Sequence, residues 1–126
     1  MGSRRRITFA LIGLVVLVVV GWFVREAVDT HDGMATKPLS ALPPEATATW
    51  KLIQQGGPFS ATRDGVVFEN REKLLPAKPA SYYHEYTVTT PGSDDRGARR
   101  LIYGQAKELY YTGDHYVSFV VVDPGK

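Results

Sequence analysis

The chain has 126 residues, 44% of them hydrophobic, which is enough for one small domain and an accessory segment. It contains no cysteine, which excludes disulfides and thiolate metal sites, and its three histidines show none of the spacings of metal ligands. The whole chain carries a net charge of +2, and from residue 36 onward 11 Lys and Arg stand against 10 Asp and Glu, so bulk charge predicts no strong nonspecific binding of nucleic acid.

The first expected element is an uncharged apolar run at residues 7–24. A helix of 18 residues spans about 27 Å, which matches the hydrocarbon core of a membrane. Arginines at positions 4–6 precede the run and only Arg25 follows it closely, so the positive-inside rule leaves the N-terminus in the cytoplasm. We therefore expect residues 1–25 to be an uncleaved transmembrane or signal anchor, followed by a polar juxtamembrane linker at residues 26–37.

A cleaved signal peptide is the alternative interpretation of the same run. The apolar core of such a peptide is usually about 7–15 residues long and ends near a small-x-small cleavage site. The run here is longer, and the charged pair Arg25-Glu26 follows it directly. In either case the domain at residues 38–126 is expected to be extracytoplasmic, held at the cell membrane by the anchor or secreted if the segment is cleaved.

The exported part is expected to begin with a helix at residues 44–55. Proline suits the first turn of a helix, and Ala46, Trp50 and Ile53 recur with the spacing of one helical face. Gly56 and the residues after it end the helix.

Extended segments follow the helix, separated by turns rich in glycine, proline and aspartate. In chain order, these expected strands are residues 66–68, 82–89, 99–103, 110–111 and 115–123. One helix followed by several short strands predicts an α+β fold, with one α-helix packed on a small antiparallel β-sheet.

The segment at residues 82–89 is the clearest of these strands. Side chains alternate between the two faces of a strand, so Glu85 points away from His84 and Tyr86. Glu85 is therefore expected on an open binding face, whereas His84 is interpreted as structural.

Five separated stretches of the domain occur in a characteristic order: LSALPPEATATWKLIQQGGPF, DGVVFENRE, YYHEYTV, RGARRLIYG and YYTGDHY. Together they resemble the secreted bacterial guanyl-specific ribonucleases, of which barnase is a distant relative. The resemblance covers nearly all of residues 39–123. It implies an endoribonuclease that needs no metal or cofactor and cleaves single-stranded RNA 3′ to guanosine. In this reaction the ribose 2′-OH attacks the adjacent phosphorus, and the resulting 2′,3′-cyclic phosphate is then hydrolysed.

The resemblance also implies the roles of the catalytic residues. Glu85 matches the general base and His115 matches the general acid, a task that suits a side chain titrating near neutral pH. Arg96 and Arg100 match the pair that clamps the phosphate, because guanidinium forks fit phosphate oxygens. Arg99 is left out, since it points to the opposite face from Arg100 if this segment is a strand. Taken singly, each of these would be an ordinary surface residue, and the assignment depends on the complete set.

The resemblance assigns guanine recognition to a short segment and one aromatic side chain. The segment consists of Phe68, Glu69, Asn70, Arg71 and Glu72. Glu72 would accept hydrogen bonds from guanine N1–H and the N2 amino group, and backbone N–H groups around Asn70 and Arg71 would donate to O6. Adenine presents the reverse pattern and would leave these groups unpaired. Tyr116 would stack on the base.

The chain departs from the family pattern at position 69, among other places, and the sequence also allows a second function. Relatives often have glutamine where this chain has Glu69, and the extra carboxylate would repel the RNA backbone. The alternative is a catalytically lapsed module that binds guanine nucleotides or RNA and is displayed on the membrane surface. The expected partners are single-stranded RNA, the membrane through the N-terminal helix and, by family analogy only, a barstar-like protein inhibitor. The domain is otherwise expected to be monomeric.

Overall fold

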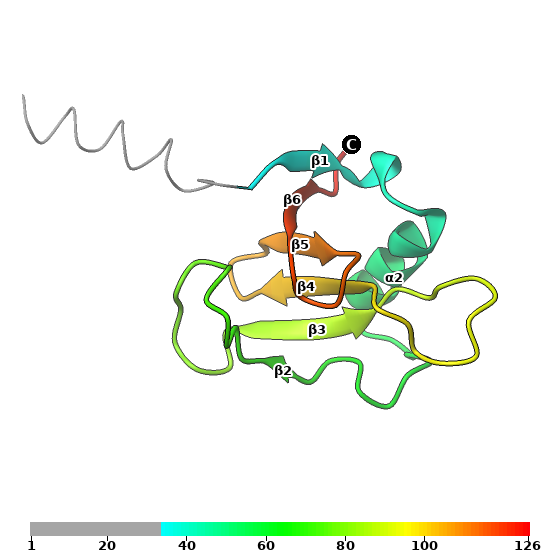
Figure 1. The fold of residues 1–126 in the computed structure, drawn as a ribbon, viewed down its shortest axis with the longest axis horizontal. Helices are drawn as coiled ribbons and strands as arrows, with labels where there is room; N and C mark the ends of the chain where they lie inside the picture. The colour runs from blue at the N-terminus through cyan, green and yellow to red at the C-terminus, as the bar shows by residue number, and fades with distance from the viewer. Residues whose placement is uncertain (1–33) are drawn as a thin grey trace, which may run out of the picture. The chain divides into compact units, whose positions relative to one another are not determined.

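The structure is a computed structural model that describes residues 34–126. The expected anchor at residues 1–25, and the first part of the expected linker, lie outside the described residues. Within the described part of the chain, no helix combines the length and the hydrophobicity of a membrane span. In chain order the elements are β1 Thr36–Pro38, the short 3-10 helix η1 Leu39–Ala41, α2 Pro44–Gln55, β2 Val67–Phe68, β3 Tyr83–Thr87, β4 Arg100–Gly104, β5 Leu109–Thr112 and β6 Val120–Asp123 (Figure 1).

The six strands form one sheet in the order β1-β6-β5-β4-β3-β2. Neighbours from β2 to β6 pair antiparallel, but β1 pairs with β6 in parallel, with Thr36 beside Val121 and Pro38 beside Asp123. The sheet is therefore mixed, and the prediction of a purely antiparallel sheet is wrong. The strand that makes the sheet mixed is β1, most of which lies in the segment predicted to be a linker. It has three residues without apolar alternation and ends in a proline, which only an edge strand tolerates.

Helix α2 has the predicted bounds and covers one face of the sheet (Figure 1). Pro44 occupies its first turn, and Gly56 ends it with a left-handed φ of 79° that favours glycine. The Thr49 hydroxyl donates to the backbone oxygen of Thr87 at 2.9 Å, which fixes the helix to the end of β3.

The sheet has a hydrophobic cluster on each face. The cluster under α2 contains Leu39, Leu42, Ala46, Val88, Leu101, Leu109 and Val122. The cluster on the other face contains Leu75, Tyr83, Ile102, Tyr110 and Phe119. Leu101 and Ile102 are both fully buried, so the central strand β4 is covered on both sides. The second face, away from the helix, also carries Glu85 and Arg100.

The last strand is shorter than predicted, because residues 113–119 form a loop rather than the start of β6. His115 and Tyr116 have φ values of 57° and 72°, which lie outside the strand region. The Asp114 carboxylate holds the loop closed by accepting from the Thr112 hydroxyl at 2.9 Å and from the Ser118 amide at 2.9 Å. The loop brings His115 and Tyr116 to the rim of the second face.

Candidate active site

Glu85 lies at the centre of β3, opposite Ile102 of β4. Its face is the one that strand alternation predicts, opposite His84 and Tyr86. Glu85 is only 5% exposed. Tyr116 of the 113–119 loop lies against the carboxylate, and Glu85 also lines an open cleft.

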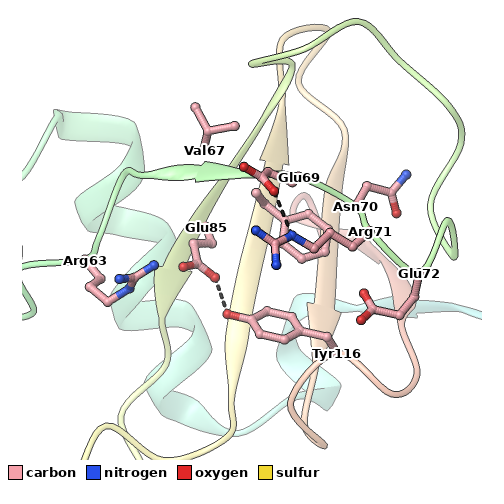
Figure 2. A pocket seen from close by; sticks show the side chains of 9 residues that line it. Arg63, Val67, Glu69, Asn70, Arg71, Glu72, Glu85 and Tyr116 are labelled. Atoms are coloured by element: carbon pink, nitrogen blue, oxygen red, sulfur yellow. Dashed lines mark hydrogen bonds and ion pairs between the residues drawn. The ribbon is translucent and has the colours of Figure 1, made fainter.

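The two carboxylate oxygens of Glu85 face different partners. The Tyr116 hydroxyl donates a hydrogen bond to Oε2, as Figure 2 shows. Nη2 of Arg96 lies 3.8 Å from Oε1 and also 3.8 Å from Oδ1 of Asp64. Nε of Arg96 donates to the Thr87 hydroxyl at 2.6 Å. The carboxylate is therefore oriented from one side by a phenol and from the other by a cation.

Each of the two predicted phosphate-binding arginines has one buried side-chain nitrogen without a hydrogen-bond acceptor among residues 34–126. Arg100 is 3% exposed, and its Nη1 donates to the backbone oxygens of Gly97 at 2.9 Å and Arg99 at 2.8 Å. Nε of Arg100 and Nη2 of Arg96 are buried, and no atom of residues 34–126 accepts a hydrogen bond from either. Unpaired buried donors are costly, so this site is suited to an anionic ligand that supplies the missing acceptors.

Arg99 contrasts with its neighbour. Its Nη1 lies 3.9 Å from Oε1 of Glu45 on helix α2, so it points to the face opposite Arg100. This is the face that strand alternation predicts for Arg99.

His115 is exposed at the rim of the site. Its amide donates to the backbone oxygen of Ala98 at 3.0 Å, which connects the 113–119 loop to the segment that carries Arg96 and Arg100. Its ring centroid lies 4.8 Å from that of Tyr116, with 34° between the ring planes. Tyr116 thus donates to the predicted general base, Glu85, through its hydroxyl and packs against the predicted general acid, His115, through its ring.

The predicted guanine-recognition segment is a closed loop after β2. The side-chain Nδ2 of Asn70 donates to the backbone oxygen of Leu75 at 2.9 Å, and the backbone amide of Leu75 donates back to Oδ1 of Asn70 at 3.1 Å. Asn70 itself has a φ of 55°, a conformation that asparagine tolerates better than most residues. Glu69 pairs with Arg71 at 2.7 Å, so the charge that departs from the family pattern is partly balanced within the loop.

An open cleft of about 360 Å³ lies between this loop and Glu85 (Figure 2). It is lined by Arg63, Val67, Phe68, Glu69, Asn70, Arg71, Glu72, Glu85 and Tyr116. All six residues predicted to contact guanine therefore line one cleft, together with Glu85, the predicted general base. Phe68 and Tyr116 form its aromatic side, with ring centroids 5.2 Å apart. His115, Arg96 and Arg100 are not in its lining but adjoin it through their contacts with Tyr116 and Glu85.

The sequence prediction missed Arg63 and Asp64. Asp64 is almost fully buried, and its Oδ1 accepts from the Thr87 amide at 2.7 Å while facing Arg96. In the sequence, Asp64 and Gly65 are seen only as a turn. An arginine directly before that turn was the available signal for Arg63, but a single basic residue in a loop is too common to stand alone.

The amino-acid sequence and the fold were compared with known proteins. Residues 25–123 match the ribonuclease family. The chain is 58% identical over 93 residues to guanyl-specific ribonuclease Sa of Kitasatospora aureofaciens, which covers 73% of this chain and 97% of that protein. It is 59% identical over 88 residues to guanyl-specific ribonuclease St of Saccharopolyspora erythraea, which covers 70% of this chain and 87% of that protein.

The fold is similar to that of ribonuclease Sa2, solved in complexes with mononucleotides. The TM-score is 0.73 at 49% identity, over 75% of this chain and 98% of that chain. A second structure of ribonuclease Sa2, with guanosine-2'-cyclophosphate, has a TM-score of 0.70 at 49% identity, over 73% of this chain and 98% of that chain.

Proposed function

The chain belongs to the bacterial guanyl-specific ribonuclease family and is an endoribonuclease, and we propose that Glu85 and His115 carry out its proton transfers. One observation above all supports this assignment. Nη2 of Arg96 is buried 3.8 Å from Glu85, Nε of Arg100 is buried on the same face of the sheet, and neither has an acceptor among residues 34–126. A phosphodiester bound next to the carboxylate would satisfy both donors.

In the first step, Glu85 accepts the proton of the guanosine 2′-OH as that oxygen attacks phosphorus. The bond from O2′ to phosphorus forms, the bond from phosphorus to O5′ breaks, and His115 protonates the leaving O5′. Because Tyr116 already donates to Oε2 of Glu85, Oε1 is the oxygen available for the incoming proton. A positioned base or acid of this kind is worth roughly 10²–10⁴ in rate.

The second step hydrolyses the 2′,3′-cyclic phosphate. The roles are reversed, so that His115 takes a proton from water and Glu85 returns one to O2′. In both steps Arg96 and Arg100 neutralise the charge that develops on the non-bridging oxygens. No step requires a metal ion, and a chelator is expected to leave the activity unchanged.

Guanosine specificity is assigned to the cleft beside the 68–72 loop. Glu72 is exposed there, free to accept from guanine N1–H and N2, and Figure 2 shows its carboxylate on the side of the cleft that faces Tyr116. The rings of Phe68 and Tyr116 provide a surface for stacking. The bonds between Asn70 and Leu75 hold the loop so that its backbone N–H groups are available to O6.

We also propose that the domain works outside the cytoplasmic membrane, held by the apolar run at residues 7–24. The length of the run and the arginines before it support an anchor. Fractionating cells and sizing the product tests this. A shortened protein in the medium would indicate cleavage and secretion. A barstar-like inhibitor is a further proposed partner, testable by adding barstar to the cleavage assay.

The activity is tested with the full chain in detergent on the dinucleoside monophosphates GpU and ApU. Cleavage of GpU with accumulation of guanosine 2′,3′-cyclic phosphate is expected, with little cleavage of ApU. Equal cleavage after adenosine would remove the specificity. Binding of guanosine monophosphate without any turnover would instead indicate a lapsed binding module.

A further inference from the structure

A second cleft, of about 680 Å³, adjoins the guanine cleft, and residues 67–70 line both. Along the site face of β3, Tyr83 lines the second cleft and Glu85 lines the first. Arg96 lies further along in the opposite direction, where its Nε donates to the Thr87 hydroxyl at 2.6 Å. Alternate residues on one face of a strand are about 7 Å apart. The second cleft therefore lies at the end of the guanine cleft away from the proposed phosphate site.

We infer that this second cleft holds the nucleotide on the 5′ side of guanosine, and that Lys73 and Lys78 bind the phosphate that joins the two. The inference rests on the proposed function. In that function guanine occupies the first cleft, and the phosphate 3′ to it lies at Glu85 and Arg96. RNA that precedes the guanosine then continues toward the Tyr83 end of β3, into the second cleft.

The far wall of the second cleft belongs to the long loop that connects β2 to β3 (Figure 1). Hydrogen bonds fix this wall to the sheet. The Tyr83 hydroxyl donates to the Pro76 oxygen at 2.7 Å, and the Tyr82 hydroxyl donates to the Glu108 carboxylate at 2.7 Å. The cleft is thereby preformed, so a ligand has little of the protein to order when it binds.

The charge of the second cleft favours an anion. Lys73 and Lys78 are exposed in its lining, and neither forms an ion pair with an acidic side chain in the described part of the chain. The acidic residue of the lining, Glu69, already pairs with Arg71 at 2.7 Å. Two free ammonium groups next to the guanine cleft of a ribonuclease are suited to a phosphate of the same RNA chain.

The rest of the lining is suited to a ribose or a base without a fixed identity. It includes Val67, Ala77, Pro79 and Ala80, and Val67 is 41% exposed. The amide of Asn70 could read the edge of a base, but both its nitrogen and its oxygen are bonded to Leu75. We therefore expect no strong preference for the base that precedes guanosine.

The test compares the double variant Lys73→Gln/Lys78→Gln with wild type, as full chains, on three substrates. GpU has no phosphate 5′ to guanosine, UpGpU has one, and GpUpU has its extra phosphate on the 3′ side. The variant is expected to lower kcat/KM on UpGpU about tenfold and on GpU and GpUpU less than about twofold, as for loss of charge-assisted contacts to one phosphate. The salt dependence on UpGpU should weaken by about one unit of slope.

Lys78→Gln alone is also tested, because Lys73 has a left-handed φ of 57° and Lys78 does not. It should show a smaller loss, again confined to UpGpU. The matched control is Lys37→Gln/Lys51→Gln, which removes two exposed positive charges from β1, at the opposite edge of the sheet from β2, and from α2. The control should retain the wild-type values on all three substrates.

Three results would overturn the inference. They are a loss by Lys78→Gln that is equal on GpU and UpGpU, the same loss on UpGpU in the control, and no loss on UpGpU in the double variant. Failure of wild type to cleave even GpU would reject the proposed function itself, and with it this inference.

Discussion

The hydroxyl of Tyr116 donates a hydrogen bond to Oε2 of Glu85, although the two residues are 31 positions apart in the sequence. This bond joins the 113–119 loop to the middle of β3. Burial raises the pKa of Tyr116, and the hydrogen bond to Glu85 raises it further, so the phenol stays protonated and continues to donate at neutral pH. Tyr116, which directly follows the proposed acid His115 in the sequence, therefore positions the proposed general base Glu85.

Glu85→Gln tests the base while keeping the shape of the site. The amide oxygen can still accept from Tyr116, but the group can no longer take a proton. We expect kcat on GpU to fall by roughly 10²–10⁴ with little change in the affinity for 3′-GMP, measured by calorimetry. Activity within tenfold of wild type would contradict the assignment of the base.

His115→Asn tests the acid, and asparagine is chosen because it tolerates the φ of 57° at this position. We expect cleavage of GpU to fall by about 10²–10⁴. Guanosine 3′-(p-nitrophenyl phosphate) carries a leaving group that needs no protonation, so its cleavage should fall much less. An equal loss on both substrates would show that His115 does not protonate the leaving oxygen.

Glu72→Gln tests guanine recognition. Inosine lacks the N2 amino group, so IpU has only one of the two donors that the carboxylate is proposed to accept from. The substitution should lower kcat/KM on GpU by about 10- to 100-fold and on IpU by less. Equal losses on GpU and IpU would mean that Glu72 does not contact the N2 amino group.

Much of this arrangement could be predicted from local patterns. The period of two in residues 82–89 assigned Glu85 and His84 to opposite faces, and proline and glycine marked both ends of α2. The match of five segments supplied the rest of the proposed set. The strand and helix signals each lie within a short stretch of sequence, and the five matching segments strengthen one another. A single sequence is therefore enough to detect them.

The features that escaped prediction depend on contacts between distant residues. β1 exists because β6 offers it an edge, and its own three residues carry no strand pattern. Asp64 matters because its carboxylate accepts from Thr87, 23 positions later. The burial of Glu85 likewise depends on Tyr116, whose left-handed φ could not be inferred from its residue type.

Leu101→Ala tests the core that supports the site. Leu101 is fully buried in the central strand, next to Arg100, so its truncation should lower the free energy of unfolding by about 2–5 kcal/mol. Val117→Ala is the matched control, because Val117 is 72% exposed and should change stability by no more than about 0.5 kcal/mol. Urea unfolding measures both. Similar losses for the two variants would contradict the assignment of the core.

Stability at alkaline pH tests the buried tyrosines on the site face. Burial raises the pKa of Tyr83, Tyr110 and Tyr116 above the ordinary tyrosine value of about 10. Between the ordinary and the raised pKa, the unfolded chain releases protons that the folded domain still holds. Their contribution to stability is therefore complete below about pH 10 and is lost as the pH rises toward the raised values.

The phenol of Tyr83 donates to the Pro76 oxygen at 2.7 Å, and Tyr83→Phe removes this titrating group without changing the ring. The variant should be less stable than wild type at neutral pH, by about 1 kcal/mol for one lost hydrogen bond, but its stability should fall less steeply above about pH 10. Urea unfolding at a series of pH values measures the slope, and absorbance of tyrosinate near 295 nm follows the ionisation directly. If wild type and Tyr83→Phe lose stability in parallel above that pH, Tyr83 does not resist ionisation in the folded state and the assignment of a raised pKa is wrong.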